Sequence, residues 1–220
     1  MSKKILFRVD AGGEIGLGHY YRSISLAKRL RESNYDITFI FKDSIFWNKI
    51  LEKNFPFPSF KIDDSTKIYS ELDVPKIESF DILYVDGFIK YNPDTIQKIK
   101  SLGLKVAFYQ NLTDSRFLSD IFITPSIHQS NEFFKGFNPS TQLFQGLKYF
   151  TFNEELFKLK EKQPIKEIKN IAITSGGSDP KNVLLSWFEI LNDKRFDEFQ
   201  FTLFYLSLIH ISEPTRQAEI

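Results

Sequence analysis

The 220-residue sequence contains no cysteine, which excludes disulfides, thiolate metal sites and cysteine nucleophiles. It also lacks an excess of charge of either sign, since 29 basic residues balance 28 acidic ones, and this gives no electrostatic argument for binding nucleic acid or an anionic membrane. No apolar run approaches the roughly 20 residues of a membrane-spanning helix, and the amino terminus has no apolar signal-peptide core. We therefore expect a cytoplasmic protein that spans no membrane and binds no nucleic acid.

Aromatic residues are abundant: 24 residues are phenylalanine, so the core is expected to depend on aromatic volume. Short apolar runs alternate with segments of helical period, and this pattern predicts parallel βαβ units with helices on both faces of a sheet. The fold class is therefore α/β, with ligands bound beyond the carboxyl ends of the strands. The expected strands of the first domain are residues 5–9, 36–41, 81–86, 105–109 and 120–124; the expected helices lie around 24–30, at 45–54 and at 94–102.

A change of composition marks a second domain. Residues 157–169 are rich in Lys and Glu and contain Pro164, which is typical of a linker. A strand at 170–174, a helix through 183–191 and a strand at 200–205 follow. The predicted organisation is a first domain over residues 1–156, a linker over 157–169 and the start of a second domain over 170–205.

The last fifteen residues, 206–220, differ in character from the rest of the chain. Leu206 to Arg216 resembles the translation of an adaptor used in transposase-based DNA library preparation. A natural strand and loop that match the adaptor by chance are the alternative. We expect this tail to be an artefact that leaves the second domain truncated, and we therefore give His210 no role.

A glycine-rich loop, residues 10–18, joins the first expected strand to the first expected helix. Its glycines allow a tight turn, and the first N–H groups of a helix favour an anion such as a diphosphate. The spacing of Gly16 and Gly18 is not the dinucleotide pattern G-x-G-x-x-G, because residue 21 is Tyr. An ordinary tight turn remains the alternative.

His19 stands at the start of the first helix, directly after this loop. A neutral imidazole beside an anion-binding loop can act as a general base on a water or a hydroxyl. A structural histidine packed against the sheet is the alternative. His128, in a polar segment, is expected to be solvated.

The segment from Phe7 to Leu30, FRVDAGGEIGLGHYYRSISLAKRL, resembles the opening of the UDP-sugar hydrolase family of pseudaminic acid biosynthesis. That family's pattern is R-x-D, a short polar stretch, I-G-x-G-H, and then Arg and a helix. The resemblance continues at Tyr84-Val85-Asp86, at residues 146–149 before Glu154-Glu155, and at residues 176–182. It covers most of residues 4–190 in the family's order.

The resemblance implies a two-domain glycosyltransferase-B fold, with a Rossmann-like first domain and a second domain that binds most of the UDP. It implies hydrolysis of a UDP-linked 2,4-diacetamido-2,4,6-trideoxy sugar, with His19 as base for the attacking water and with no metal or cofactor. An ordinary strand-to-helix turn is the alternative for Gly176-Gly177. The oligomeric state is left open. The substrate-binding residues that the resemblance implies are Asp10, Gly16, Gly18, Arg22, Asp86, Phe88, Tyr149, Gly176, Gly177 and Ser178.

The sequence departs from the family at several of these places. Gly87-Phe88 stands where the family commonly has His and Tyr, Gln110-Asn111 stands for an acidic pair, and Asn153 stands for an Arg. Three functions therefore stay open: a UDP-sugar hydrolase, a glycosyltransferase for polysaccharide or flagellar glycan, and a non-catalytic nucleotide-sugar-binding domain. Because the implied UDP pocket belongs to the truncated second domain, we expect the 220-residue chain to be inactive by itself.

Overall fold

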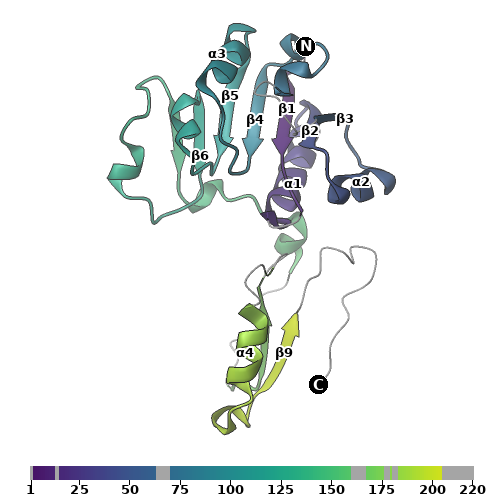
Figure 1. Cartoon of the computed structure of the whole chain (residues 1–220), viewed down its shortest axis with the longest axis vertical. Coiled ribbons are helices and arrows are strands. Elements are labelled where there is room, and N and C mark those ends of the chain that lie inside the picture. Colours follow the sequence, from purple (N-terminus) through teal and green to yellow (C-terminus); the bar gives the residue numbers. More distant parts are fainter. Residues whose placement is uncertain are drawn as a thin grey trace. The chain divides into compact units, whose positions relative to one another are not determined.

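The computed structural model describes residues 2–12, 15–62, 70–159, 167–175, 179 and 183–204 (Figure 1). The chain divides into two compact units, one of residues 1–10 and 19–154 and the other of residues 11–18 and 155–220. Gly176, Gly177, Ser178 and the tail 206–220 lie outside the described residues, as does most of the predicted linker. The domain boundaries given above stay predictions.

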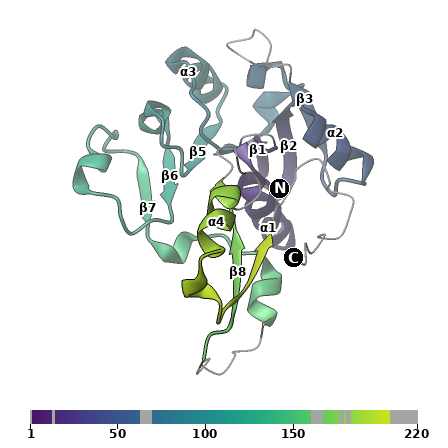
Figure 2. The same cartoon turned by 60° about the horizontal axis from the view of Figure 1, so that its bottom comes forward.

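The first unit is built on a seven-stranded parallel sheet of order β3-β2-β1-β4-β5-β6-β7 (Figures 1 and 2). The order runs outward in both directions from the central pair β1 and β4, so the chain reverses its winding direction there. In parallel sheets, ligands commonly bind beyond the carboxyl ends of the strands at such a reversal. The strands are β1 (Lys4–Val9), β2 (Asp36–Lys42), β3 (Ser59–Ile62), β4 (Ile82–Asp86), β5 (Lys105–Tyr109), β6 (Ile121–Thr124) and β7 (Gln142–Gln145).

Three α-helices connect these strands: α1 (Gly18–Glu32), α2 (Ile45–Glu52) and α3 (Pro93–Ser101). Two of them begin at side-chain caps. The Ser44 hydroxyl accepts from the backbone N–H of Trp47 at 3.3 Å, and the Asn92 amide oxygen accepts from Asp94 N–H at 2.9 Å. The short 3₁₀ turns are η2 (Ser70–Asp73), η3 (Ile77–Ser79), η4 (Asp114–Leu118), η5 (Asn131–Phe134), η6 (Leu147–Tyr149) and η7 (Glu154–Lys158).

Alternation along the strands gives each face of the sheet its own core. On the face covered by α3, helix residues Ile96 and Ile99 pack against strand residues such as Leu83 and Phe108. On the opposite face, Trp47 of α2 stacks on Phe41 with ring centroids 4.3 Å apart. Most of the buried aromatic rings, which the composition led us to expect, therefore lie on the α1 and α2 face. They include Phe7, Phe39, Phe41, Trp47 and Tyr84.

The second unit contains one further βαβ element: β8 (Asn170–Thr174), α4 (Val183–Leu191), the turn η8 (Lys194–Phe196) and β9 (Gln200–Phe204). β8 and β9 are parallel, with Asn170 opposite Gln200 and Thr174 opposite Phe204. The Asp179 carboxylate accepts from the backbone N–H groups of Val183 and Leu184, at 2.8 and 3.0 Å, and so caps α4.

The predicted α/β class and parallel sheet are confirmed, and every expected strand and helix is present. Strands β3 and β7 were not predicted. Among the described residues no helix combines the length and apolarity needed to cross a membrane.

Candidate functional site

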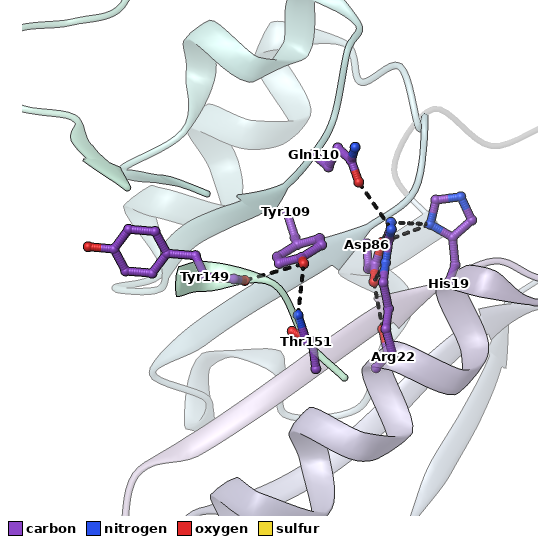
Figure 3. Close-up of polar contacts among 8 residues, drawn as sticks. His19, Arg22, Asp86, Tyr109, Gln110, Tyr149 and Thr151 are labelled. Carbon is purple, nitrogen blue, oxygen red and sulfur yellow. Dashed lines mark hydrogen bonds and ion pairs between the residues drawn. The ribbon is translucent and has the colours of Figure 1, made fainter. Parts of the chain in front are cut away.

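A polar cluster lies where the first helix faces the carboxyl ends of β4 and β5. His19, Arg22 and Ser23 occupy positions i, i+3 and i+4 of α1, and therefore share one face of that helix. All three side chains reach the carboxylate of Asp86, the last residue of β4. Figure 3 shows the contacts of His19 and Arg22. Asp86 is fully buried, so this carboxylate depends on its protein partners for every hydrogen bond.

The partners of Asp86 satisfy both carboxylate oxygens. Oδ2 accepts from Arg22 Nε at 2.7 Å and from the Ser23 hydroxyl at 2.9 Å. Oδ1 accepts from Arg22 Nη2 and lies 2.8 Å from His19 Nδ1. The Arg22 guanidinium therefore binds the Asp86 carboxylate in a bidentate manner, through two parallel N–H groups, and this is the strong geometry for an arginine–carboxylate pair.

Two contacts of Nδ1 bear on the tautomer of the His19 imidazole. Nδ1 lies 2.8 Å from Asp86 Oδ1 and 2.7 Å from Arg22 Nη2. Nδ1 cannot both donate to the carboxylate and accept from the guanidinium, so only one of these two contacts is a hydrogen bond. Because Arg22 Nη2 already donates to Asp86 Oδ1, we assign the proton to Nδ1, which then donates to Oδ1, and the short Nδ1–Nη2 distance joins two donors that share one acceptor. The other ring nitrogen, Nε2, then keeps its lone pair, and it points away from Asp86 (Figure 3).

The far side of Arg22 is held by two residues at the end of β5. Its Nη1 donates to the Gln110 side-chain oxygen at 3.1 Å, and its Cζ lies 4.8 Å from the centre of the Tyr109 ring. Burial by itself lowers the pKa of Arg22, but the hydrogen bonds and charge of Asp86 outweigh it and raise that pKa above its ordinary value. Burial also raises the pKa of Tyr84, which therefore stays an uncharged phenol beneath the cluster.

An exposed aromatic ring borders the imidazole. Phe88 is 57% exposed and stands edge-on to His19, with ring centroids 5.6 Å apart. The intervening Gly87 has φ +151°, a backbone angle that other residues rarely adopt, and this turn brings Phe88 over His19 directly after β4. An apolar, exposed ring thus lies next to the imidazole.

Asp10 lies in a different cluster. Its carboxylate oxygens contact the guanidinium of Arg8 at 3.0 Å, and Oδ1 accepts from Lys42 N–H at 3.4 Å. Arg8 also pairs with the buried Glu71, which accepts a hydrogen bond from Tyr91 at 2.8 Å. Asp86 is the register partner of Val9 in the sheet, so the two side chains point to the same face. Side chains alternate along a strand, so Arg8 points to the opposite face, the one covered by α3, and its partner Asp10 lies on that side.

The remaining predicted residues are placed as follows. Gly16, with φ +79°, lies in the glycine-rich loop, where its carbonyl accepts from Gly12 N–H at 2.9 Å, and Gly18 begins α1. Tyr149 contributes only its carbonyl to this neighbourhood, as an acceptor 3.4 Å from the Tyr109 hydroxyl; its ring points away from His19 (Figure 3). His128 is exposed, as expected. The structure therefore gathers His19, Arg22, Asp86 and Phe88.

Three members of the cluster were not among the predicted site residues: Ser23, Tyr109 and Gln110. Helical spacing could have indicated Ser23, because it stands four residues after His19. Strand ends could have indicated Tyr109, since Asp86 and Tyr109 are register partners in adjacent parallel strands. Within the described residues, no three His, Asp or Glu side chains come together as a metal site.

The side chain of Asn111 forms hydrogen bonds to two loops that border the cluster, the one after β4 and the one after β5. Its side-chain nitrogen donates to the Ile89 carbonyl at 2.8 Å, while its oxygen accepts from the Thr113 N–H and hydroxyl at 2.9 and 2.7 Å. An amide can donate and accept at once, whereas an ionised carboxylate can only accept, so the carboxylate expected from the family at position 111 could not donate to the Ile89 carbonyl.

We expect Asn111→Asp to lower the free energy of unfolding by about 2–3 kcal/mol, because the fully buried Asn111 side chain loses its amide donor to the Ile89 carbonyl and turns a carboxylate toward that carbonyl. Urea denaturation of both proteins measures this. The matched control is Asn92→Asp, at the exposed cap of α3, where Asp caps as well as Asn and the change should stay within about 0.5 kcal/mol. Equal effects at the two positions would contradict the linking role of Asn111.

Comparisons with known proteins place this geometry in context. The chain is 31% identical over 202 residues to an uncharacterized protein of Methanocaldococcus jannaschii, covering 88% of the chain and 41% of that protein. It is 25% identical over 184 residues to the UDP-2,4-diacetamido-2,4,6-trideoxy-beta-L-altropyranose hydrolase of Campylobacter jejuni, covering 83% of the chain and 63% of the hydrolase. The chain thus spans about half the length of these curated relatives. No protein-family model matches it.

A solved structure shares the fold. The UDP-GlcNAc 2-epimerase of Methanocaldococcus jannaschii aligns with 93% of the chain and 66% of its own length, at a TM-score of 0.53 and 14% identity. MurG of Acinetobacter baumannii aligns with 79% of the chain and 50% of its own, at a TM-score of 0.49 and 15% identity. The likeness to the epimerase agrees with the predicted Rossmann-like sheet of glycosyltransferase-B type.

Proposed function

We propose that the complete protein is a UDP-sugar hydrolase in which His19 is the general base. The observation that carries this proposal is the pairing of His19 Nδ1 with Asp86 at 2.8 Å at the carboxyl edge of the sheet. In the tautomer assigned above, Nε2 carries the lone pair. An imidazole oriented by a buried carboxylate is a recurrent arrangement for removing a proton from a nucleophile. The relative of known activity, the altropyranose hydrolase, supports the choice of a UDP-sugar as substrate.

In the proposed reaction, Nε2 of His19 takes a proton from a water molecule whose oxygen bonds to the anomeric carbon. The bond between that carbon and the diphosphate oxygen breaks, and its electron pair leaves with UDP. Asp86 stabilises the imidazolium that forms, while Arg22 and Ser23 keep the carboxylate in place. The products are UDP and the free sugar.

The substrate is proposed to lie over the start of α1. The first N–H groups of this helix point toward its N-terminal end and favour an anionic group, and the α1 side chains of the first turn include no acid that would repel one. Phe88 would contact the apolar face of the sugar. Gly176, Gly177 and Ser178 are proposed to bind the diphosphate, as the sequence resemblance implies.

A turnover assay on the complete protein tests this function. UDP-sugars, including the 2,4-diacetamido-2,4,6-trideoxy substrate and UDP-GlcNAc, are incubated without any acceptor, and UDP release is measured. We expect UDP and free sugar in equal amounts, with oxygen from ¹⁸O-labelled water on the sugar. UDP release only after a sugar acceptor is added would indicate a glycosyltransferase, and binding without turnover of any donor would indicate a binding domain.

We expect Gly18→Ala to weaken UDP-sugar binding while leaving the fold intact. A Cβ at this position meets no atom within 4 Å, so the methyl group fits the protein alone. If the substrate approaches the helix start closely, the methyl group crowds it, and binding weakens by about 1–3 kcal/mol. Calorimetric titration with UDP-sugar and a thermal melt measure the two effects; unchanged affinity would place the substrate elsewhere.

A further inference from the structure

The backbone of Gln110 adopts an unusual conformation beside the polar cluster. Its φ is +52°, in the left-handed region that residues other than glycine rarely enter. Asn34 and Asn54 share this feature, but they follow the helices α1 and α2, where a left-handed residue commonly ends a helix. Gln110 instead follows a strand directly, and glutamine is not a residue type that favours this region.

This conformation brings two consecutive side chains to one guanidinium. Side chains alternate along a strand, so a regular continuation of β5 would point Tyr109 and residue 110 to opposite faces. Tyr109 lies under Arg22, with 4.8 Å between the ring centre and Cζ, and Gln110 nevertheless accepts from Nη1 of the same Arg22 at 3.1 Å (Figure 3). The left-handed turn makes the second contact possible.

Gln110 keeps its backbone hydrogen bond to the neighbouring strand despite the left-handed conformation. The Gln110 N–H donates to the Ile123 carbonyl of β6 at 2.7 Å. The conformation is therefore fixed by the sheet on one side and by Arg22 on the other. A strained residue that is held from both sides is a common feature of functional sites.

We propose that Gln110 is a positioning residue that locks the guanidinium of Arg22, and through Asp86 the imidazole of His19, for the reaction proposed above. Asp86 holds Nε and Nη2, Gln110 holds Nη1, and the Tyr109 ring covers one face, so Arg22 cannot rotate. This inference rests on the proposed hydrolase function for its catalytic consequence, but the locking of Arg22 can be measured without turnover.

The side-chain amide of Gln110 is neutral, so it holds Arg22 without adding a negative charge to the cluster. The charges of Arg22 and Asp86 balance each other, and the other titratable groups that face Arg22 are the His19 imidazole and the phenols of Tyr84 and Tyr109. A carboxylate at position 110 would satisfy Nη1 equally well but would make the cluster anionic. An anionic cluster repels the diphosphate of a UDP-sugar, so a neutral acceptor holds Arg22 without disfavouring the substrate.

The test compares Gln110→Gly and Gln110→Glu with the control Asn34→Gly in the complete protein. Gln110→Gly removes the contact and relieves the backbone, and Gln110→Glu keeps the acceptor but adds a charge. Asn34→Gly relieves an exposed left-handed turn just after the C-terminal end of α1, whereas Arg22 lies near the start of that helix. The readouts are the separate Nη ¹⁵N NMR signals of Arg22, the melting temperature, and kcat and KM on the best UDP-sugar.

For Gln110→Gly we expect averaged Arg22 Nη signals, a kcat reduced about 10- to 100-fold, and a melting temperature equal to the wild type or up to about 4 °C higher. For Gln110→Glu we expect locked signals and a raised KM. Asn34→Gly should change neither the NMR signals nor kcat.

Arg22 signals that stay separate in Gln110→Gly, or a kcat that falls only together with the melting temperature, would overturn the positioning role. If the wild type turns over no UDP-sugar, the proposed hydrolase function fails, and the Arg22 signals alone then decide whether Gln110 locks the guanidinium.

Discussion

Replacing His19 by alanine is expected to lower kcat for UDP-sugar hydrolysis by about 10²- to 10⁴-fold, the range that a general base contributes. The reason is the lone pair on Nε2, since Asp86 and Arg22 occupy the other side of the ring. KM should change little, because the imidazole acts on water rather than on the sugar or the nucleotide. Steady-state kinetics on the complete protein measure both values.

Two further variants separate chemistry from folding. His19→Gln retains an N–H that can donate to Asp86 but offers no basic nitrogen, so its kcat should fall as far as that of His19→Ala while its melting temperature stays near the wild type. His128→Ala changes an exposed histidine and should leave both unchanged. A loss of less than tenfold in His19→Gln would show that His19 is a structural histidine.

Replacing Asp86 by alanine is expected to have the largest effect on stability, about 3–5 kcal/mol. The carboxylate is fully buried, and its removal leaves the guanidinium of Arg22, with 19% of its side chain exposed, without a counter-charge. The Ser23 hydroxyl and His19 Nδ1 lose their acceptor as well. Urea denaturation gives the loss directly.

A double-mutant cycle distinguishes a buried charge from a simple cavity. Asp86→Ala combined with Arg22→Leu removes both charges, so the double variant should be more stable than Asp86→Ala alone. Asp86→Ala within about 1 kcal/mol of the wild type would mean that the cluster contributes little to folding. Additive losses in the cycle would mean that the two side chains act independently.

Most of the fold was predictable because the strands of a parallel sheet are buried on both faces and read as apolar runs. The two missed strands lie at the sheet edges, where this signal fades. β7 reads Gln-Leu-Phe-Gln and β3 reads Ser-Phe-Lys-Ile, and each has only four residues. An edge strand has a neighbour on one side only, so its sequence need not be apolar.

The site was predictable in part. His19 and Asp86 could be read from a helix start and a strand end, because these positions converge in any parallel sheet. Asp10 shows the limit of that argument: it also follows a strand, yet its pairing with Arg8 takes it to the other cluster. The contact of Gln110 with Arg22 depends on one backbone angle, which no residue pattern at that position indicates.

The hydrogen bonds of Asn111 have a consequence for redesigning substrate preference. Loops after strand ends are the usual segments to exchange between related enzymes, since the strands beneath them need not change. Here the loop that carries Phe88 is attached through Ile89 to the loop at Thr113, because a single amide bonds to both. A graft of either loop alone would leave that amide without its partner, so the segments after β4 and β5 should be transplanted as a pair.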